Sequence, residues 1–361
     1  MALFGRKRLQ TRDPDPFPPW NPSPVWNQNL AGVSVNDATA LGIVTLWRCV
    51  DLISSTIGSL SVHAFRDGER IDTPAILMQP NPTENRIDTY SALITSALLR
   101  GNAYALMGDF DRFGHPRQLV VLDPDAVQVE VSPDTGSITY KVGQEAYTRF
   151  EMMHMRGFMR PGHVVGQGIL DAHRHALGLA IAEHEWTERI FSEGSIPSGV
   201  ITTDVDLSPE AATELKKAWV QSHGGRDRTP AVLSGGLAYK PIQLSNSDLE
   251  LLEARKWSAT QIAALFGVPA HLAGAPSSDS LTYSTVAEDS RAFVRFGLRP
   301  WVHRLEAALS NALPRGQSAS ISVADFMQPD MLTRYQAAQI AIEAGFKTVQ
   351  MVQNEEGIEA G

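Results

Sequence analysis

The stretch ALFGVPAHLAGAPSSDSLTYS, residues 264–284, joins two patterns that each predict a long helix. The first pattern ends at Phe266, where Gly267-Val268-Pro269 supplies the glycine and proline that stop helices. Small and polar residues follow, and the second pattern begins near Tyr283. Loops of this kind are usually functional or disordered, so residues 273–281, which offer little to a core, form the first candidate site.

Long helices are predicted on both sides of this loop. One runs from Asp248 to Phe266 and the other from Tyr283 to Ala312. Proline inside a helix removes a backbone hydrogen bond, so Pro300 predicts a kink near Gly297.

A further helix, Asp171–Glu193, is apolar on two opposite faces. One face carries Leu177, Ala180, Ile181, His184 and Phe191, and the other carries Leu179, Ala182, Trp186 and Ile190. A helix with two apolar faces packs between two partners, which are either parts of one core or neighbouring subunits of a ring.

A compact insert, residues 195–245, separates this helix from the next. It contains the strand SGVIT, a helix with Ser208 as N-cap, and a hairpin that turns at Gly235-Gly236. Its basic residues Lys216, Lys217, Arg226 and Arg228 fit two interpretations equally: contact with an acidic partner or DNA phosphate, or a solvated helix end.

The N-terminal part predicts an extended arm followed by an α+β domain over residues 36–170. Six prolines in residues 13–30 exclude a helix or a central strand there. Helical patterns at Asn36–Leu60 and Asp88–Arg100, the second closed by Gly101, precede a β-rich block that predicts a meander.

Composition restricts the class of protein. A chain of 361 residues with 43% hydrophobic and 20% charged residues predicts a globular protein. Its net charge of −9 argues against gripping nucleic acid over a large surface, but not against letting it slide past. The single cysteine, Cys49, excludes an internal disulfide, and no apolar run reaches the roughly 18 residues that span a membrane.

Motifs for catalysis and metal binding are weak. HEWTE (184–188) lacks the second histidine of a zinc helix, and DFDRFG (109–114) is a hairpin turn rather than a calcium loop. The pairs Asp123/Asp125 and Asp204/Asp206 border turns, where aspartate is common. No catalytic residue, metal or cofactor is predicted. The alternative is a small hydrolase or metal-dependent enzyme that uses the His and Asp clusters.

Several blocks, in order, resemble one family. They include TLWRCVDLISSTIGSLSVHAF, LLRGNAYALMGDFDRFGHPRQLVVLDPDAVQV, FSEGSIPSGVI and RAFVRFGLRPWVHRLEAAL. From about Thr45 to Leu313 the chain resembles the portal proteins of long-tailed double-stranded DNA bacteriophages. The resemblance implies an α+β portal-type subunit with an α+β wing, paired stem helices, a small α/β clip insert and a long kinked helix.

Mapped onto this chain, the resemblance implies eight segments. They are an extended arm at 1–35, a wing at 36–170, a first stem helix at 171–194, a clip at 195–245, a second stem helix at 246–266, a tunnel loop at 267–284, a kinked helix returning to the wing at 285–328, and a crown-like helical segment at 329–361.

The resemblance also implies a structural role rather than an enzymatic one. The subunit would form a ring, commonly of twelve copies, at one capsid vertex of a virion assembled in the host cytoplasm. It would be a conduit for double-stranded DNA during genome packaging and ejection. Its partners would be the terminase large subunit, a head–tail connector protein, and the major capsid protein or scaffold.

Three sets of residues are the candidate sites of such a subunit. The DNA-channel loop holds Gly274, Pro276, Ser277, Ser278, Asp279 and Ser280. The docking surface of the clip holds Lys216, Lys217, Arg226 and Arg228. Subunit contacts along the stem involve Leu179, Trp186, Ile190 and Phe191.

Overall fold

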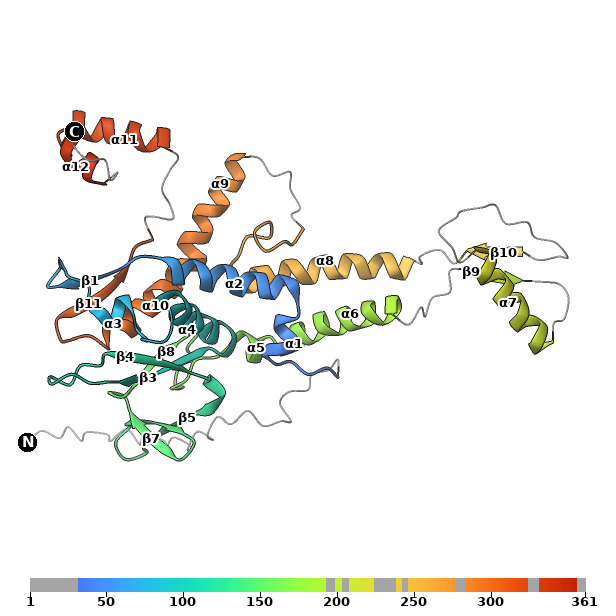
Figure 1. Ribbon diagram of the computed structural model, residues 1–361, viewed down its shortest axis with the longest axis horizontal. Coiled ribbons are helices and arrows are strands. Elements are labelled where there is room, and N and C mark those ends of the chain that lie inside the picture. The colour runs from blue at the N-terminus through green and yellow to red at the C-terminus, as the bar shows by residue number, and fades with distance from the viewer. Residues whose placement is uncertain are drawn as a thin grey trace, which may run out of the picture. The chain divides into compact units, whose positions relative to one another are not determined.

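The computed structural model describes residues 32–192, 199–202, 208–223, 238–241, 246–276, 283–323 and 331–355 (Figure 1). Most of the predicted arm, residues 1–31, lies outside this range. The chain divides into a larger unit, Met1–Leu179 with Ser258–Gly361, and a smaller unit, Ala180–Trp257. We call residues 36–170 of the larger unit the body.

The body begins with two helices, α1 (Asp37–Leu41) and α2 (Val44–Ser59), where one was predicted. Asn36 is the N-cap of α1, as expected, and forms a capping box with Thr39. On α2 the buried positions are Leu46, Cys49, Val50, Ile53 and Ile57, whereas Val44 and Trp47 are exposed. The periodicity therefore located the helix, but part of its predicted apolar face lies in solvent.

Helix α4 (Arg86–Arg100) crosses α2 at close range. A Cβ atom on Gly58 of α2 would lie 2.9 Å from the carbonyl oxygen of Ile87 on α4, so only glycine permits this approach. As predicted, α4 ends at Gly101, which adopts the left-handed conformation with a φ of 73°. The short α3 (Ala75–Met78) precedes α4, and the buried hydroxyl of Tyr90 donates to the carbonyl of Leu77 at 2.9 Å.

Two three-stranded sheets form the centre of the body. The first has the order β4-β3-β8, and α4 packs against it. The second has the order β5-β6-β7 and is a meander, but the predicted meander covered the whole β-rich block, which the structure divides into two sheets because β8 returns to pair with β3. Tyr104, Val127, Tyr140 and Met152 form a buried cluster that joins the two sheets. The strands are β3 (Asn102–Gly108), β4 (Gln118–Leu122), β5 (Val127–Val131), β6 (Ile138–Val142), β7 (Glu145–Thr148) and β8 (Met152–Arg156).

A third sheet, with the order β11-β1-β2, brings distant parts of the sequence together. β1 (Val62–Arg66) pairs with β2 (Glu69–Ile71) and, on its other side, with β11 (Gln317–Ile321). β11 was not predicted from the sequence. Its outer backbone N–H groups are satisfied by a helix, because Ala319 donates to Ser310 Oγ at 2.9 Å and Ile321 to Glu306 Oε1 at 2.7 Å.

The helices that flank the loop have the predicted order. α5 (Ile169–Ala172) and α6 (Arg174–Ser192) follow the body, and α8 (Asn246–Phe266) precedes the loop. After the loop come α9 (Tyr283–Ala292), the π-helical turn η3 (Phe293–Leu298) and α10 (Arg299–Ser310). The interruption predicted near Gly297 is thus present as a π-helical turn. Two further helices, α11 (Met331–Glu343) and α12 (Val349–Glu355), follow β11.

The smaller unit contains a β pair and a helix. β9 (Gly199–Thr202) pairs antiparallel with β10 (Ala238–Pro241), and α7 (Pro209–His223) lies between them in sequence. Ser208 is the N-cap of α7, as predicted, because its Oγ accepts from the N–H of Ala211 at 3.3 Å. The predicted turn at Gly235-Gly236 lies outside the described residues.

Candidate functional site

Helix α8 ends in a Schellman motif at the start of the candidate loop. Gly267 has a φ of 66°, its N–H donates to the carbonyl of Ala264, and the N–H of Val268 donates to the carbonyl of Ala263. Val268 and Ala263 are both buried. The sequence Gly-Val-Pro therefore ends the helix and turns the chain back against it.

Residues 269–275 form a compact turn. The N–H of Leu272 donates to the carbonyl of Pro269 at 3.0 Å, and the N–H of Ala275 donates to that of Ala270 at 2.8 Å. Ala273 and Ala275 are 1% and 6% exposed, so the expectation that residues 273–281 offer little to a core is wrong for these two.

Two predicted residues of the DNA-channel loop lie at the edge of this turn. Gly274 and Pro276 are exposed. Ser277, Ser278, Asp279 and Ser280 lie outside the described residues, and their role stays a prediction.

The two ends of the candidate loop rest on a shared base. His271, before the loop, lies with its Nδ1 3.7 Å from Asp289 Oδ2 on α9, after the loop. Arg48 of α2 donates from Nε to the carbonyl of Leu272 at 3.3 Å. At the end of α8, a Cβ atom on Gly297 of η3 would lie 2.9 Å from the carbonyl oxygen of Gly267. These contacts therefore connect the turn that precedes the loop to α2, α9 and η3.

The backbone at Leu99–Gly101 contacts the backbone at Gly166–Gly168, just before α5. We call this contact the glycine crossing. A Cβ atom on Gly166 would overlap the carbonyl oxygen of Gly101, and one on Gly168 would overlap that of Leu99. Asn102 reinforces the crossing, because its Oδ1 accepts from the N–H of Gly166 at 2.7 Å and its Nδ2 donates to the carbonyl of Gly166 at 2.8 Å. The position where α5 begins is therefore fixed by backbone contact.

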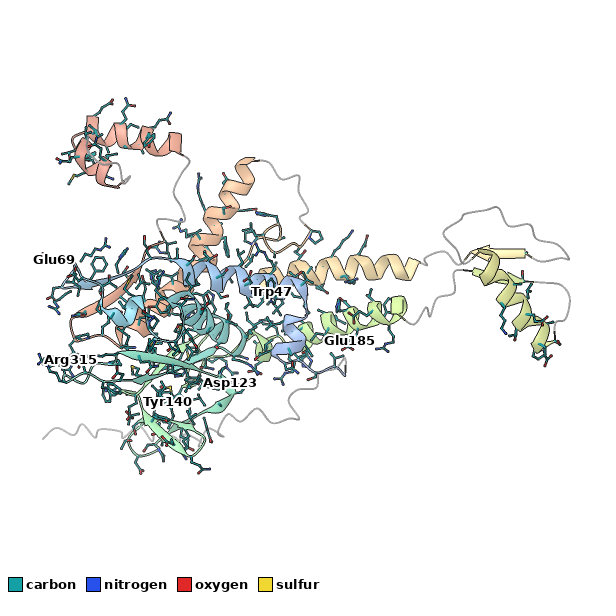
Figure 2. All side chains as sticks on the ribbon, viewed as in Figure 1. Trp47, Glu69, Asp123, Tyr140, Glu185 and Arg315 are labelled. Atoms are coloured by element: carbon teal, nitrogen blue, oxygen red, sulfur yellow. The ribbon has the colours of Figure 1, made fainter. Side chains whose placement is uncertain are left out.

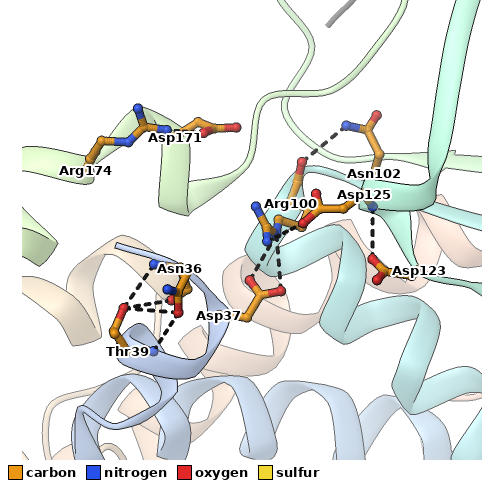
Figure 3. Close-up of polar contacts among 9 residues, drawn as sticks. All are labelled: Asn36, Asp37, Thr39, Arg100, Asn102, Asp123, Asp125, Asp171 and Arg174. Atoms are coloured by element: carbon orange, nitrogen blue, oxygen red, sulfur yellow. Dashed lines mark hydrogen bonds and ion pairs between the residues drawn. The ribbon is translucent and has the colours of Figure 1, made fainter. Parts of the chain in front are cut away.

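Charged side chains surround the same connection, as Figure 3 shows. Arg100 bridges two carboxylates, with Nε 3.0 Å from Asp37 Oδ1 and Nη2 2.6 Å from Asp125 Oδ2. Arg174 pairs with Asp171 at 2.7 Å. Burial raises the pKa of both Asp125 and Asp171 even though these arginines oppose the shift. Arg100 therefore ties α4 to α1 and to the turn that holds Asp125, and the Arg174–Asp171 pair joins α6 to α5.

The Asp123/Asp125 pair has structural roles in this cluster. Asp123 Oδ1 accepts from the N–H of Asp125 at 2.9 Å and caps the short helix η2 (Pro124–Ala126), while Asp125 binds Arg100. The interpretation of this pair as turn residues is confirmed. Asp204 and Asp206 lie outside the described residues.

Helix α6 has one buried face and one exposed apolar face. Leu177, Ala180 and Ile181 are buried. On the opposite side, Leu179 is 52% exposed and Trp186 is 42% exposed. The side chains of Ile190 and Phe191, the other two predicted contact residues, lie outside the description. The second apolar face of the predicted pattern is therefore exposed among the described residues.

The predicted docking residues of the insert are only partly described. Lys217 on α7 is exposed, whereas the side chain of Lys216 and the whole of Arg226 and Arg228 lie outside the described residues. Their role stays a prediction.

The His and Asp motifs take part in local hydrogen bonds and ion pairs. His184 Nε2 lies 3.4 Å from Glu188 Oε1, within HEWTE. Asp111 Oδ1 accepts from the N–H groups of Phe113 and His115, so DFDRFG is a turn. Within the described part of the chain, no three His, Cys, Asp or Glu side chains are grouped to hold a metal ion.

His154 belongs to a polar group within the body. Its Nε2 donates to Asn102 Oδ1 at 3.0 Å, and the hydroxyl of Tyr140 lies 3.3 Å from its Nδ1. The ring of Tyr104 lies 4.4 Å from the imidazole ring, centroid to centroid. Burial, and to a smaller extent Arg156, lowers the pKa of His154 from 6.5 to about 3, so the imidazole is neutral at pH 7. The group joins the two central sheets.

Comparison with known proteins identifies the family. The sequence model described as phage portal protein matches residues 44–357. The chain belongs to the phage portal protein family. This family is structural rather than enzymatic, and its members are virion components. None of the described helices of this family member is long and apolar enough to cross a lipid bilayer.

Individual relatives support the assignment. The probable portal protein of Streptomyces phage phiC31 is 30% identical over 341 residues, which cover 86% of this chain and 74% of that protein. Two solved structures are 26% identical, and each match covers 90% of this chain and 92% of theirs. They are the neck of an empty gene transfer agent (GTA) particle computed with C6 symmetry, with a TM-score of 0.67, and the neck of the native particle computed with C12 symmetry, with a TM-score of 0.65.

Three arginines were not among the predicted site residues. Arg291, Arg295 and Arg299 repeat every four residues through α9, η3 and α10, and all three are exposed. The four-residue spacing is visible in the sequence, but the alignment of the three residues depends on the π-helical turn, which the sequence did not predict.

Proposed function

We propose that this portal-family chain forms a closed ring of twelve subunits at one vertex of a capsid. The observation that carries the proposal is the uncovered apolar face of α6, where Leu179 and Trp186 are exposed opposite a buried face. Cyclic symmetry covers such a face, because each subunit offers one surface to the neighbour on either side. The C12 symmetry of the related particle neck supports the number twelve.

The ring would conduct double-stranded DNA during genome packaging and ejection. In such a ring each copy would project residues 274–280 toward the axis, so that twelve loops surround the DNA. Small side chains and Asp279 would touch DNA weakly, since each phosphate gripped by a cation would oppose sliding. The shared base formed by His271, Asp289 and Arg48 supports this role, because it fixes the position of the turn from which the loop departs.

Partner proteins would dock at the insert between α6 and α8. The basic residues Lys216, Lys217, Arg226 and Arg228 would contact the terminase large subunit and later a head–tail connector protein, while the major capsid protein or scaffold would hold the ring at its vertex. Assembly would take place in the host cytoplasm. Reversal of the four charges should weaken terminase binding in a pull-down at moderate salt, and unchanged binding would move the docking site elsewhere.

Shortening the loop tests the conduit role. Deletion of residues 278–280 leaves the described base intact, so rings and empty capsids should form in normal amounts. Nuclease-protected DNA per particle should fall, because a shorter loop no longer reaches the DNA. A length-matched control, Ser278→Gly with Asp279→Gly and Ser280→Gly, should fill normally. Particles that package and retain full genomes with the deletion would contradict the conduit role of this loop.

A further inference from the structure

An arginine row runs along the helical segment that follows the candidate loop. It consists of Arg291 on α9, Arg295 in η3 and Arg299 at the start of α10. All three side chains are exposed (Figure 1 shows the helices concerned). The arginine row stands out in a chain whose net charge is −9.

The π-helical turn brings the three arginines into line. In an uninterrupted α-helix, residues four apart drift by about 40° around the axis per step, so three of them would fan out over about 80°. A π-helix bonds residue i to i+5 and has more residues per turn, which reduces this drift. Because η3 spans Phe293–Leu298, the steps from Arg291 to Arg299 pass mainly through it. The backbone positions of the three arginines therefore lie on one narrow face of the helical segment.

These arginines have no partner of their own in the described residues. Within the described part of the chain, none of the three forms a hydrogen bond or an ion pair, although Glu288 lies one turn before Arg291. The nearby carboxylates are engaged: Asp289 faces His271 at 3.7 Å, and Glu306 accepts from the N–H of Ile321 at 2.7 Å.

An exposed aromatic ring accompanies the row. Arg295 stacks over the ring of Phe296 at 5.4 Å, and Phe296 is 71% exposed. The stack restricts the Arg295 side chain before any ligand binds. Less side-chain entropy is therefore lost when its guanidinium binds an anion.

We propose that the arginine row binds the phosphate backbone of duplex DNA. Eight residues of helix span about 12 Å, and one DNA strand carries a phosphate about every 3.4 Å along its axis, so the row faces three or four phosphates. Arginine binds phosphate with two parallel hydrogen bonds and without reading sequence. The choice of DNA rather than an acidic protein segment rests on the proposed conduit function, which brings duplex DNA to this chain.

Three phosphate contacts give a grip that depends steeply on salt. Each neutralised phosphate contributes about 0.9 to the slope of log K against log salt, so three contribute about 2.7 per subunit that touches the DNA. Between 50 and 200 mM salt the contribution of the row therefore falls about 40-fold. The row would therefore hold DNA reversibly and oppose its sliding, in contrast to the loop.

The test measures binding of a 30-base-pair duplex to the full-length protein by fluorescence anisotropy over about 50–300 mM NaCl. R291Q/R295Q/R299Q should lower the salt slope by about 2.7 or more. R291K/R295K/R299K should keep most of the slope, because charge rather than shape produces it. A matched control, R112Q/R117Q/R149Q, removes three exposed arginines of the body and should leave the slope unchanged.

Two results would overturn the proposal. In the first, the slope of log K against log salt falls by the same amount in the glutamine and control variants. Net charge, rather than the position of the arginines, would then explain the fall. In the second, the glutamine variant keeps wild-type DNA binding but runs as smaller species by mass photometry, which would assign the row to contacts between subunits. Failure of the wild-type protein to form rings would contradict the proposed function instead, so the two failures are distinguishable.

Discussion

His154 of the body and Trp186 of α6 have opposite surroundings. His154 lies between Tyr104 and Tyr140, and hydrogen bonds to Asn102 and Tyr140 satisfy both of its ring nitrogens. Trp186 is 42% exposed, on the same face of α6 as Leu179 (Figure 2 labels neighbouring Glu185). His154 is therefore enclosed within the body, whereas the described residues leave an apolar face of α6 exposed. The comparison shows that His154 is enclosed by side chains of the body, whereas Leu179 and Trp186 of α6 stay exposed among the described residues.

The largest expected effect is in the body, at the glycine crossing. Gly166→Ala places a Cβ atom inside the van der Waals radius of Gly101 O, which must separate two backbone segments and break the bonds of Asn102 to Gly166. We expect a loss of about 4 kcal/mol in the free energy of unfolding, measured by urea denaturation.

Gly162→Ala is the matched control for this change. Gly162 has a φ of 82°, but nothing lies within 4 Å of its added Cβ. The substitution should cost only the left-handed backbone strain, about 1–2 kcal/mol. Equal losses at the two positions would show that close backbone contact does not join the body to α5.

An intermediate effect is expected from acid. The pKa of His154 is about 3 in the folded chain and near 6.5 when unfolded, so between these values the unfolded chain binds more protons. The stability from neutral His154 is fully present above pH 6.5 and is lost as the pH falls toward 3. At pH 5 the loss should be about 2 kcal/mol, measured by urea denaturation at a series of pH values.

His154→Gln isolates this contribution. Glutamine donates a hydrogen bond to Asn102 Oδ1 but does not titrate, so the variant should lose less stability than the wild type between pH 6.5 and 5. A variant with an unchanged pH dependence would assign acid sensitivity to other groups.

The smallest effect on folding is expected on α6. Trp186→Glu changes an exposed side chain, so the free energy of unfolding of the body should shift by no more than about 0.5 kcal/mol. A loss comparable with that of Gly166→Ala would mean that Trp186 belongs to the core of a single chain, and the comparison between the two regions would fail.

The sequence predicted elements where local signals determine them. Gly101 ends α4, Ser208 begins α7, and Gly267-Val268 closes α8, because capping depends on a few adjacent residues. It failed for β11, whose pairing with β1 joins residues about 250 positions apart and has no local signature. It also failed for Ala273 and Ala275, since small residues carry no apolar pattern that separates a packed turn from an open loop.

The sequence predicted those parts of the candidate sites that depend on one helix and missed those that depend on the fold. Periodicity on α6 indicated an outer apolar face at Leu179 and Trp186 because amphipathic spacing is readable along one helix. The arginine row required the structure, because its alignment depends on η3, and a π-helical turn has no reliable signal in the sequence. Asn102 and His154 likewise meet only after β3 and β8 pair.

The central claim is that α6 joins neighbouring subunits of a closed ring. Mass photometry of the full-length protein tests this claim most directly. The account predicts one species of about twelve subunits for the wild type and for Trp186→Phe, which keeps an apolar ring at this position. It predicts smaller species for Trp186→Glu, whose charge would be buried in the contact. A wild type that stays monomeric, or a Trp186→Glu variant that still forms the full ring, would contradict it.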